Sequence, residues 1–200
     1  MRLDDEQIER YSRQLILQEV GPRGQERLLA SRVAVVGTDA AAAHVVAYLA
    51  AAGVGAIAAD PALHAAIDPR QADCTVGTLA TAPAVVDALI VSAASGDSAT
   101  ERLAAWRGRS SVRFWIAAGH AGSVPPCPTC ALADRAPHAA IPAFSRLYDA
   151  TLGSIVATET VKSLIGIGVP LTGHVLAYDV ATATLERRVV RKSCACAETV

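Results

Sequence analysis

The sequence has few aromatic residues, almost no lysine and no long apolar run. Aromatic residues make up 4% of the chain, and Lys162 and Lys192 are its only lysines. Because the formal net charge is −1, no positive field attracts a nucleic acid. No apolar stretch reaches the roughly 18 residues that a membrane-spanning helix needs. The first residues are polar and acidic, unlike a signal or transit peptide, so we expect a cytoplasmic protein.

What is present is enough chain for one globular domain, with a strand-helix-strand pattern near its start. The chain has 200 residues, of which 52% are hydrophobic. Residues 31–60 predict a buried strand at 33–36, an alanine-rich helix at 40–52 that Gly53 ends, and a second strand that closes on Asp60. An acidic residue about 20 positions after the first turn is typical of a nucleotide-binding Rossmann-type crossover.

The turn of this crossover lacks the glycines that let a backbone approach a phosphate. It reads Gly37-Thr-Asp-Ala-Ala-Ala-Ala, so only Gly37 remains. We expect Asp39 to cap the helix by accepting from N–H groups of its first turn, which stabilises a helix by about 1 kcal/mol. The same carboxylate would occupy and repel an anion at the helix N-terminus. The turn therefore predicts a helix start and a poor phosphate site.

Four of the five cysteines form two close pairs, Cys127 with Cys130 and Cys194 with Cys196. In a reducing cytosol, close pairs indicate a metal site before a disulfide. Cys74 stands alone in a strand-like segment, and we expect it to be a small buried apolar residue.

Two segments of the chain resemble the ThiF/MoeB/HesA family, the bacterial relatives of ubiquitin-activating E1 enzymes. The first is RYSRQLILQEVGPRGQERLLASRVAVVG at 10–37 with AYLAAAGVG at 47–55, and the second is SIVATETVKSLIGIGVPLTGHVLAYD at 154–179. The resemblance implies an α/β, Rossmann-like fold with a mostly parallel sheet flanked by helices. We expect a single domain over 1–200, with an N-terminal helical arm at 1–30, broken at Gly21-Pro22, and a core at 31–193.

The resemblance also implies an activity. Members of the family use ATP and magnesium to adenylate the C-terminal glycine of a β-grasp, ubiquitin-like carrier protein. They work as homodimers or heterodimers, and many contain a structural zinc ion. Each functional position of the family must be compared with this chain separately, and most of the expected residues are missing.

The nucleotide positions show the largest losses. Of the family's loop Gly-x-Gly-Gly-Leu-Gly only Gly37 remains, while Asp60 falls where the ribose-binding acid ends the second strand. The Asn-Leu-x-Arg-Gln segment is represented only by Arg70-Gln71, with no lysine after it. The interval from Asp60 to the next buried strand, at about 88–91, is too short for the family's strand and helices, and a deletion accounts for this.

Two further positions concern magnesium and a partner chain. The family's next strand ends in an Asp-x-x-Asp-type sequence whose second carboxylate holds magnesium, and here Ser92 and Ser95 stand at the acidic positions. Asp97 lies two residues out of register, either as a displaced metal ligand or as a loop or helix-capping residue. Arg13 matches an arginine that reaches across the family's dimer to the partner's nucleotide; the alternative is a surface or ion-paired helix residue.

The resemblance places the metal as well. The family pairs a CxxC like that of Cys127 and Cys130 with a second pair near the C-terminus, where this chain has Cys194-Ala-Cys196. Four thiolates would give a closed tetrahedral zinc site that adds stability without chemistry. Free thiols or an incomplete site are the alternative. No cysteine lies between the pairs, so nothing matches the cysteine that some members use for a persulfide or thioester.

The remaining expectations concern the second half of the chain. The two strands that the family has between Gly119 and the CxxC look missing, and His120 and His174 are expected to be surface or loop residues. Apolar spacing predicts a core-facing helix at 145–165, and 185–191 predicts an edge strand with a basic face.

Two functions compete on this evidence. The preferred hypothesis is a degenerate member of the family that does not adenylate and acts as a dimerising partner, scaffold or regulatory subunit of a ubiquitin-like sulfur-carrier system, without ATP, magnesium or a catalytic residue of its own. The alternative is a working adenylyltransferase with a rebuilt site that uses Arg70, Asp97 and a partner's Arg13. A weaker third possibility is a domain that binds another nucleotide through Asp60.

Overall fold

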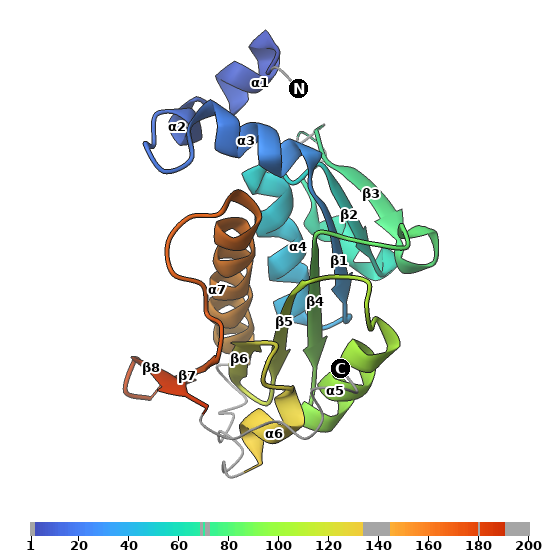
Figure 1. The fold of residues 1–200 in the computed structure, drawn as a ribbon, viewed down its shortest axis with the longest axis vertical. Helices are drawn as coiled ribbons and strands as arrows, with labels where there is room; N and C mark the ends of the chain where they lie inside the picture. Colours follow the sequence, from blue (N-terminus) through green and yellow to red (C-terminus); the bar gives the residue numbers. More distant parts are fainter. Residues whose placement is uncertain (1–2, 69, 71–72, 134–144, 180, 191–200) are drawn as a thin grey trace.

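The computed structural model describes residues 3–68, 70, 73–133, 145–179 and 181–190 (Figure 1). Within these residues, eight strands form one sheet in the order β3-β2-β1-β4-β5-β6-β7-β8. Neighbours from β3 to β5 pair in parallel, and those from β5 to β8 are antiparallel. The strands are β1 Arg32–Val36, β2 Ala56–Ala59, β3 Thr75–Thr78, β4 Ala88–Ala93, β5 Val112–Ala117, β6 His120–Ser123, β7 His174–Asp179 and β8 Thr184–Val189.

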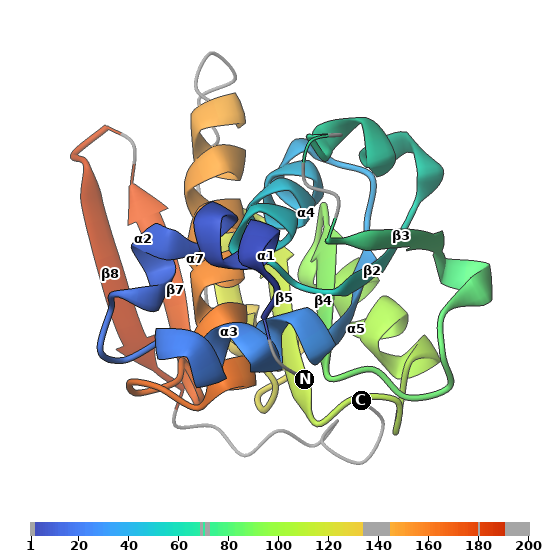
Figure 2. The same ribbon diagram turned by 90° about the horizontal axis from the view of Figure 1, so that it is seen from above.

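Helices cover both faces of the sheet (Figures 1 and 2). Alternate residues of β5 show the two layers, because Phe114 packs with α4 and α7 in one core cluster while Trp115 packs with α5 and α6 in the other. The helices are α1 Asp5–Arg10, α2 Ser12–Leu15, α3 Gly21–Ala30, α4 Ala40–Ala52, α5 Gly96–Ala105, α6 Pro128–Leu132 and α7 Ser145–Ile165, with short 3-10 helices η1 Pro61–Ala66 and η2 Leu79–Thr81. None of the helices in the described ranges is long and apolar enough to cross a membrane.

The predicted fold class and the first crossover are confirmed. The buried strand is β1, the alanine-rich helix α4 spans Ala40–Ala52, and the second strand β2 ends immediately before Asp60. Gly53 ends α4 in the left-handed conformation, with φ of 91°, as a glycine at this position allows. The crossover therefore places the start of α4 at the carboxyl ends of β1 and its neighbour β4.

The N-terminal arm differs from its prediction in one detail. Asp4 caps α1 through a capping box with Gln7. The predicted helix break is displaced: it lies at 16–20, between α2 and α3, and α3 begins at Gly21. Proline is tolerated in the first turn, where the N–H that it lacks has no partner within the helix. Figure 1 shows α1 to α3 at the amino ends of the central strands, far from the start of α4.

The shortened intervals still contain strands. Strand β3, with η1 and η2, fits between β2 and β4. Strand β6 fits between Gly119 and the CxxC, so the expectation that both family strands are missing there is wrong for one of them. A tight turn at Ala118 and Gly119, with φ of 49° and 76°, reverses the chain directly from β5 into β6. His120 was predicted at the surface; it is 5% exposed, because β6 lies inside the sheet.

Candidate functional site

A cavity of about 410 Å³ lies at the carboxyl ends of β1, β4 and β5. The chain order of the strands reverses between β1 and β4, and ligands of open α/β sheets bind at this switch point. The starts of α4 and α7 form the rest of the wall. The described lining residues are Asp39, Ala41, Ser92, Ala93, Ala94, Ile116, Ala117, Ala118, Gly119, Ser145, Tyr148, Asp149 and Leu152.

Asp39 occupies the N-terminus of α4 with its own carboxylate. Its Oδ1 accepts from the backbone N–H of Ala42 at 2.9 Å and from the hydroxyl of Ser92 at 2.8 Å. The predicted helix cap is therefore confirmed, and Ser92 supports it. Because this carboxylate already lies at the positive end of the helix, a phosphate would have to displace a fixed negative charge.

The one remaining glycine of the loop has a packing role. A β-carbon at Gly37 would lie 2.7 Å from the backbone oxygen of Ser92 and 3.4 Å from Cβ of Ala42. Strand β4 and the first turn of α4 thus approach this backbone so closely that a side chain would force a shift. The glycine is explained by this contact alone, without a nucleotide.

The described wall of the cavity contains two carboxylates. Asp149, near the start of α7, is the second carboxylate in its wall, and partial burial followed by the charge of Asp39 raises the pKa of Asp149. No lysine or arginine is found among the described residues that line the cavity. Arg102 of α5 comes near, but its Nη1 donates to the backbone oxygen of Ser92 at 2.9 Å. Such a wall does not neutralise a triphosphate.

The other predicted ATP positions have local partners. Asp60 accepts from the N–H of Ala62 at 2.9 Å and thereby caps η1. The guanidinium of Arg70 is bound to Asp68 at 2.6 Å, and this arginine side chain is 89% exposed. Asp97 accepts from the hydroxyl of Thr129 at 2.8 Å, at the start of α5. A structural contact therefore accounts for each of the three side chains.

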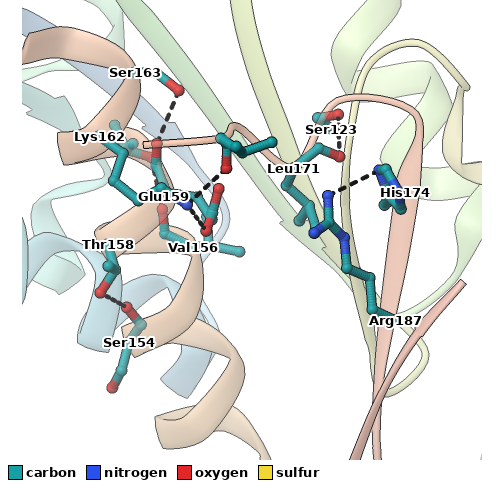
Figure 3. Close-up of polar contacts among 12 residues, drawn as sticks. Ser123, Ser154, Val156, Thr158, Glu159, Lys162, Ser163, Leu171, His174 and Arg187 are labelled. Carbon is teal, nitrogen blue, oxygen red and sulfur yellow. Dashed lines mark hydrogen bonds and ion pairs between the residues drawn. The ribbon is translucent and has the colours of Figure 1, made fainter. Parts of the chain in front are cut away.

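Two of the described cationic residues, Arg13 and Lys162, lie away from the cavity. Arg13 is exposed on α2, and Figure 1 shows this helix at the opposite end of the sheet from the start of α4, so the arm does not bring Arg13 to the cavity of its own chain. Lys162 lies near the carboxyl end of α7, where its Nζ donates to Glu159 at 2.5 Å and to the Val169 oxygen at 2.9 Å (Figure 3). Neither side chain substitutes for the missing cations.

Half of the predicted metal site falls in the described part of the chain. Cys127 is buried at the N-cap of α6, and Cys130 is partly buried one turn later, so both thiols lie at the same helix start. Cys194 and Cys196 lie outside the described residues. The separate Cys74, predicted to be buried, is only partly buried against the core, and this burial raises the pKa of its thiol to about 11.

The sequence of this chain is similar to sequences of known proteins. The ThiF family matches residues 11–59. The sulfur carrier protein adenylyltransferase of Thermus thermophilus is 30% identical over 249 aligned residues, which cover 98% of this chain and 92% of that protein. The chain belongs to the ThiF family. Because 249 aligned positions exceed the 200 residues of the chain, the alignment contains gaps on the side of this shorter ThiF-family protein.

Similarity of this ThiF-family protein to other relatives is concentrated in a short segment. The SAMP-activating enzyme E1 of Haloferax volcanii is 56% identical over 55 residues, which cover 28% of this chain and 20% of that protein. Among solved structures, E. coli MccB with ATP has a TM-score of 0.66 at 14% identity, covering 94% of this chain and 72% of that chain. PaaA has a TM-score of 0.69 at 17% identity, covering 96% and 76%. These two likenesses establish the fold alone.

Sequence reasoning missed Asp149 and Tyr148 in the cavity wall. Both were part of a helix that was judged only by its apolar spacing. Their position, in the first turns of a helix that begins at the carboxyl ends of the strands, is the signal that could have identified them.

Proposed function

We propose that this protein is a ThiF-family member that does not adenylate, and that it acts as a partner subunit of a complete ThiF-type enzyme in a ubiquitin-like sulfur-carrier system. The observation that carries this proposal is the carboxylate of Asp39 at the N-terminus of α4, held there by Ala42 and Ser92. Nucleotidyl transfer depends on positioning and neutralising a triphosphate. A cavity wall with two carboxylates opposes both requirements.

The partner role is supported by the outer surface of the arm. Arg13 is exposed, and the neighbouring Ile16 and Leu17 are 81% and 49% exposed. Large apolar side chains next to a charged one are common at protein interfaces, where they become buried. In this proposal, Arg13 enters the nucleotide site of the partner, whose own residues hold ATP and magnesium, and the partner adenylates the β-grasp carrier.

An active adenylyltransferase is the second candidate, and the name of the Thermus thermophilus relative favours it. Pyrophosphate exchange decides between the two. The purified chain is incubated with ATP, magnesium and a β-grasp carrier protein, and titration calorimetry measures binding of ATP with magnesium. We expect no exchange above background and no micromolar binding. Either signal would refute the non-adenylating role.

The partner role is tested with a complete ThiF-family enzyme of the same organism. Adding this chain is expected to raise the exchange rate of that enzyme severalfold, and Arg13→Ala is expected to remove the increase without preventing association. Arg23→Ala, on α3 of the same arm, is the matched control. An increase that survives Arg13→Ala would contradict the role of Arg13.

We also propose that Cys127, Cys130, Cys194 and Cys196 hold one structural zinc ion. The two described cysteines fit, since they begin one helix three positions apart, as thiolate pairs in structural zinc sites do. Elemental analysis of purified protein is expected to find about one zinc per chain, and a chelator is expected to lower the Tm. Protein without zinc would eliminate the four-thiolate site. Cys74→Ser should retain the full zinc content.

A further inference from the structure

Three side chains of the arm converge on one carboxylate, that of Asp73. Gln7 donates from Nε2 to Oδ1 at 3.3 Å, Tyr11 donates from its hydroxyl to Oδ2 at 3.1 Å, and Arg10 forms an ion pair with the same Oδ2. The three donors are spaced three and four positions apart, so α1 and its C-cap present them on one face. Asp73 lies more than 60 residues away in sequence, just before β3.

These contacts are the main attachment of α1. The helix buries none of its own residues. Tyr11, at its C-cap, is 3% exposed, and its ring lies against Gly53 so closely that a β-carbon there would be 2.8 Å from Cζ of the ring. Burial, and then the charge of Asp73, raise the pKa of Tyr11 to about 12, so the phenol stays protonated and donates.

The ion pair is also partly shielded from water. The side chain of Asp73 is 17% exposed and that of Arg10 is 30% exposed. A carboxylate that receives one charged and two neutral donors in such a setting holds its partners in a fixed geometry, unlike an isolated pair of surface charges. Arg13 follows three residues after Arg10 and has an exposed side chain. Arg13 lies on α2, which begins directly after Tyr11, so the anchoring of α1 and of its C-cap fixes where α2 begins.

We propose that Asp73 is the positioning residue of the arm. It fixes α1, and with it the start of α2, so that the Arg13 side chain extends from the arm in one direction and can reach a partner chain. This inference rests on the proposed function, in which Arg13 serves the partner's site. Asp73 itself touches no reacting group. Its position links the arm to the segment before β3.

Hydrogen exchange of the full chain tests the attachment. Asp73→Asn keeps the shape of the side chain and removes its charge, and it is expected to raise the exchange rates of the amides in α1 and α2 by roughly tenfold. Asp68→Asn is the matched control, because Asp68 pairs with Arg70 within the same segment, and no hydrogen bond or ion pair joins it to the described residues of the arm. Unchanged protection of α1 and α2 in Asp73→Asn would overturn the inference.

A charge swap and the partner assay separate positioning from general stability. Arg10→Asp with Asp73→Arg restores an ion pair in reversed order and should recover the part of the protection that the ion pair supplies, but not the part from Gln7 and Tyr11, which lose their acceptor. In the partner assay, Asp73→Asn should reduce the increase in pyrophosphate exchange as Arg13→Ala does. If Arg13→Ala lowers the increase and Asp73→Asn does not, the positioning role is wrong. If Arg13→Ala has no effect while Asp73→Asn frees the arm, the proposed function fails and the attachment by Asp73 stands.

Discussion

Replacing Trp115 by alanine is expected to lower the free energy of unfolding by about 3–5 kcal/mol, the range for deleting a large buried aromatic side chain. Trp115 is 0% exposed in the centre of β5 and pairs with Val91 and Gly122 on the neighbouring strands. Its ring lies directly over Gly122, where a β-carbon would be 2.6 Å from Cζ2. The backbone of Gly122, held in the sheet, cannot move into the space that the ring leaves, so we expect a value near the upper end.

Thermal unfolding measures this effect, with an expected fall in Tm of roughly 6 to 20 °C for a chain of this size. Trp115→Phe is the control. It keeps most of the ring and removes Nε1, a buried donor with no partner among the described residues, so it should lose less than half as much stability. A loss below about 1 kcal/mol in Trp115→Ala would contradict the packing described for this face.

Gly55→Ala is the second change with a large expected effect. A β-carbon at Gly55 would lie 1.8 Å from the backbone oxygen of Leu29 and 2.7 Å from its carbonyl carbon. Backbone atoms cannot relieve such a clash by a change of rotamer, as a flexible side chain can. The N–H of Gly55 also donates to Leu28 at 3.0 Å and its oxygen accepts from Thr75 at 2.8 Å, so a shift would strain both bonds. We expect a loss of about 3 kcal/mol.

Gly77→Ala on β3 is the matched control for that change, since the nearest atom to its new β-carbon would be Oγ1 of Thr81 at 3.3 Å. Chemical denaturation of both variants should show a large fall in the midpoint for Gly55→Ala and a small one for Gly77→Ala. Equal effects would mean that the close approach of α3 to the start of β2 is not what makes Gly55 intolerant of a side chain.

Much of the fold was readable from local patterns. The limits of α4 and α7 follow from an aspartate cap, apolar spacing and glycine stops, all of which act within a few residues. The strand β6 was missed because its residues, His120–Ser123, carry no strand-like composition. Partners on both sides, β5 and β7, hold them in the sheet. The start of α3 was placed about two residues late because Gly21-Pro22 was taken as a break and not as a first turn.

In the candidate site, too, contacts between near neighbours in the sequence could be predicted and contacts between distant residues could not. Asp39 as a cap could be predicted, because a capping bond reaches only three residues along the chain. Its bond with Ser92 could not, because 53 residues separate the two and only the pairing of β1 with β4 brings them together. The same holds for Asp73, since nothing in its neighbours along the chain indicates the arm.

The sequence alone determined the α/β class, the first crossover, the loss of lysine and glycine at the ATP positions, and the resemblance to the ThiF family. These properties depend on residue type and short spacing. Only the tertiary structure decided that the carboxylates of Asp39 and Asp149 share one cavity, that Arg13 lies at the other end of the sheet, and that Asp73 holds the arm. The physical reason is that strand pairing and helix packing bring distant residues together, and a local pattern carries no information about such contacts.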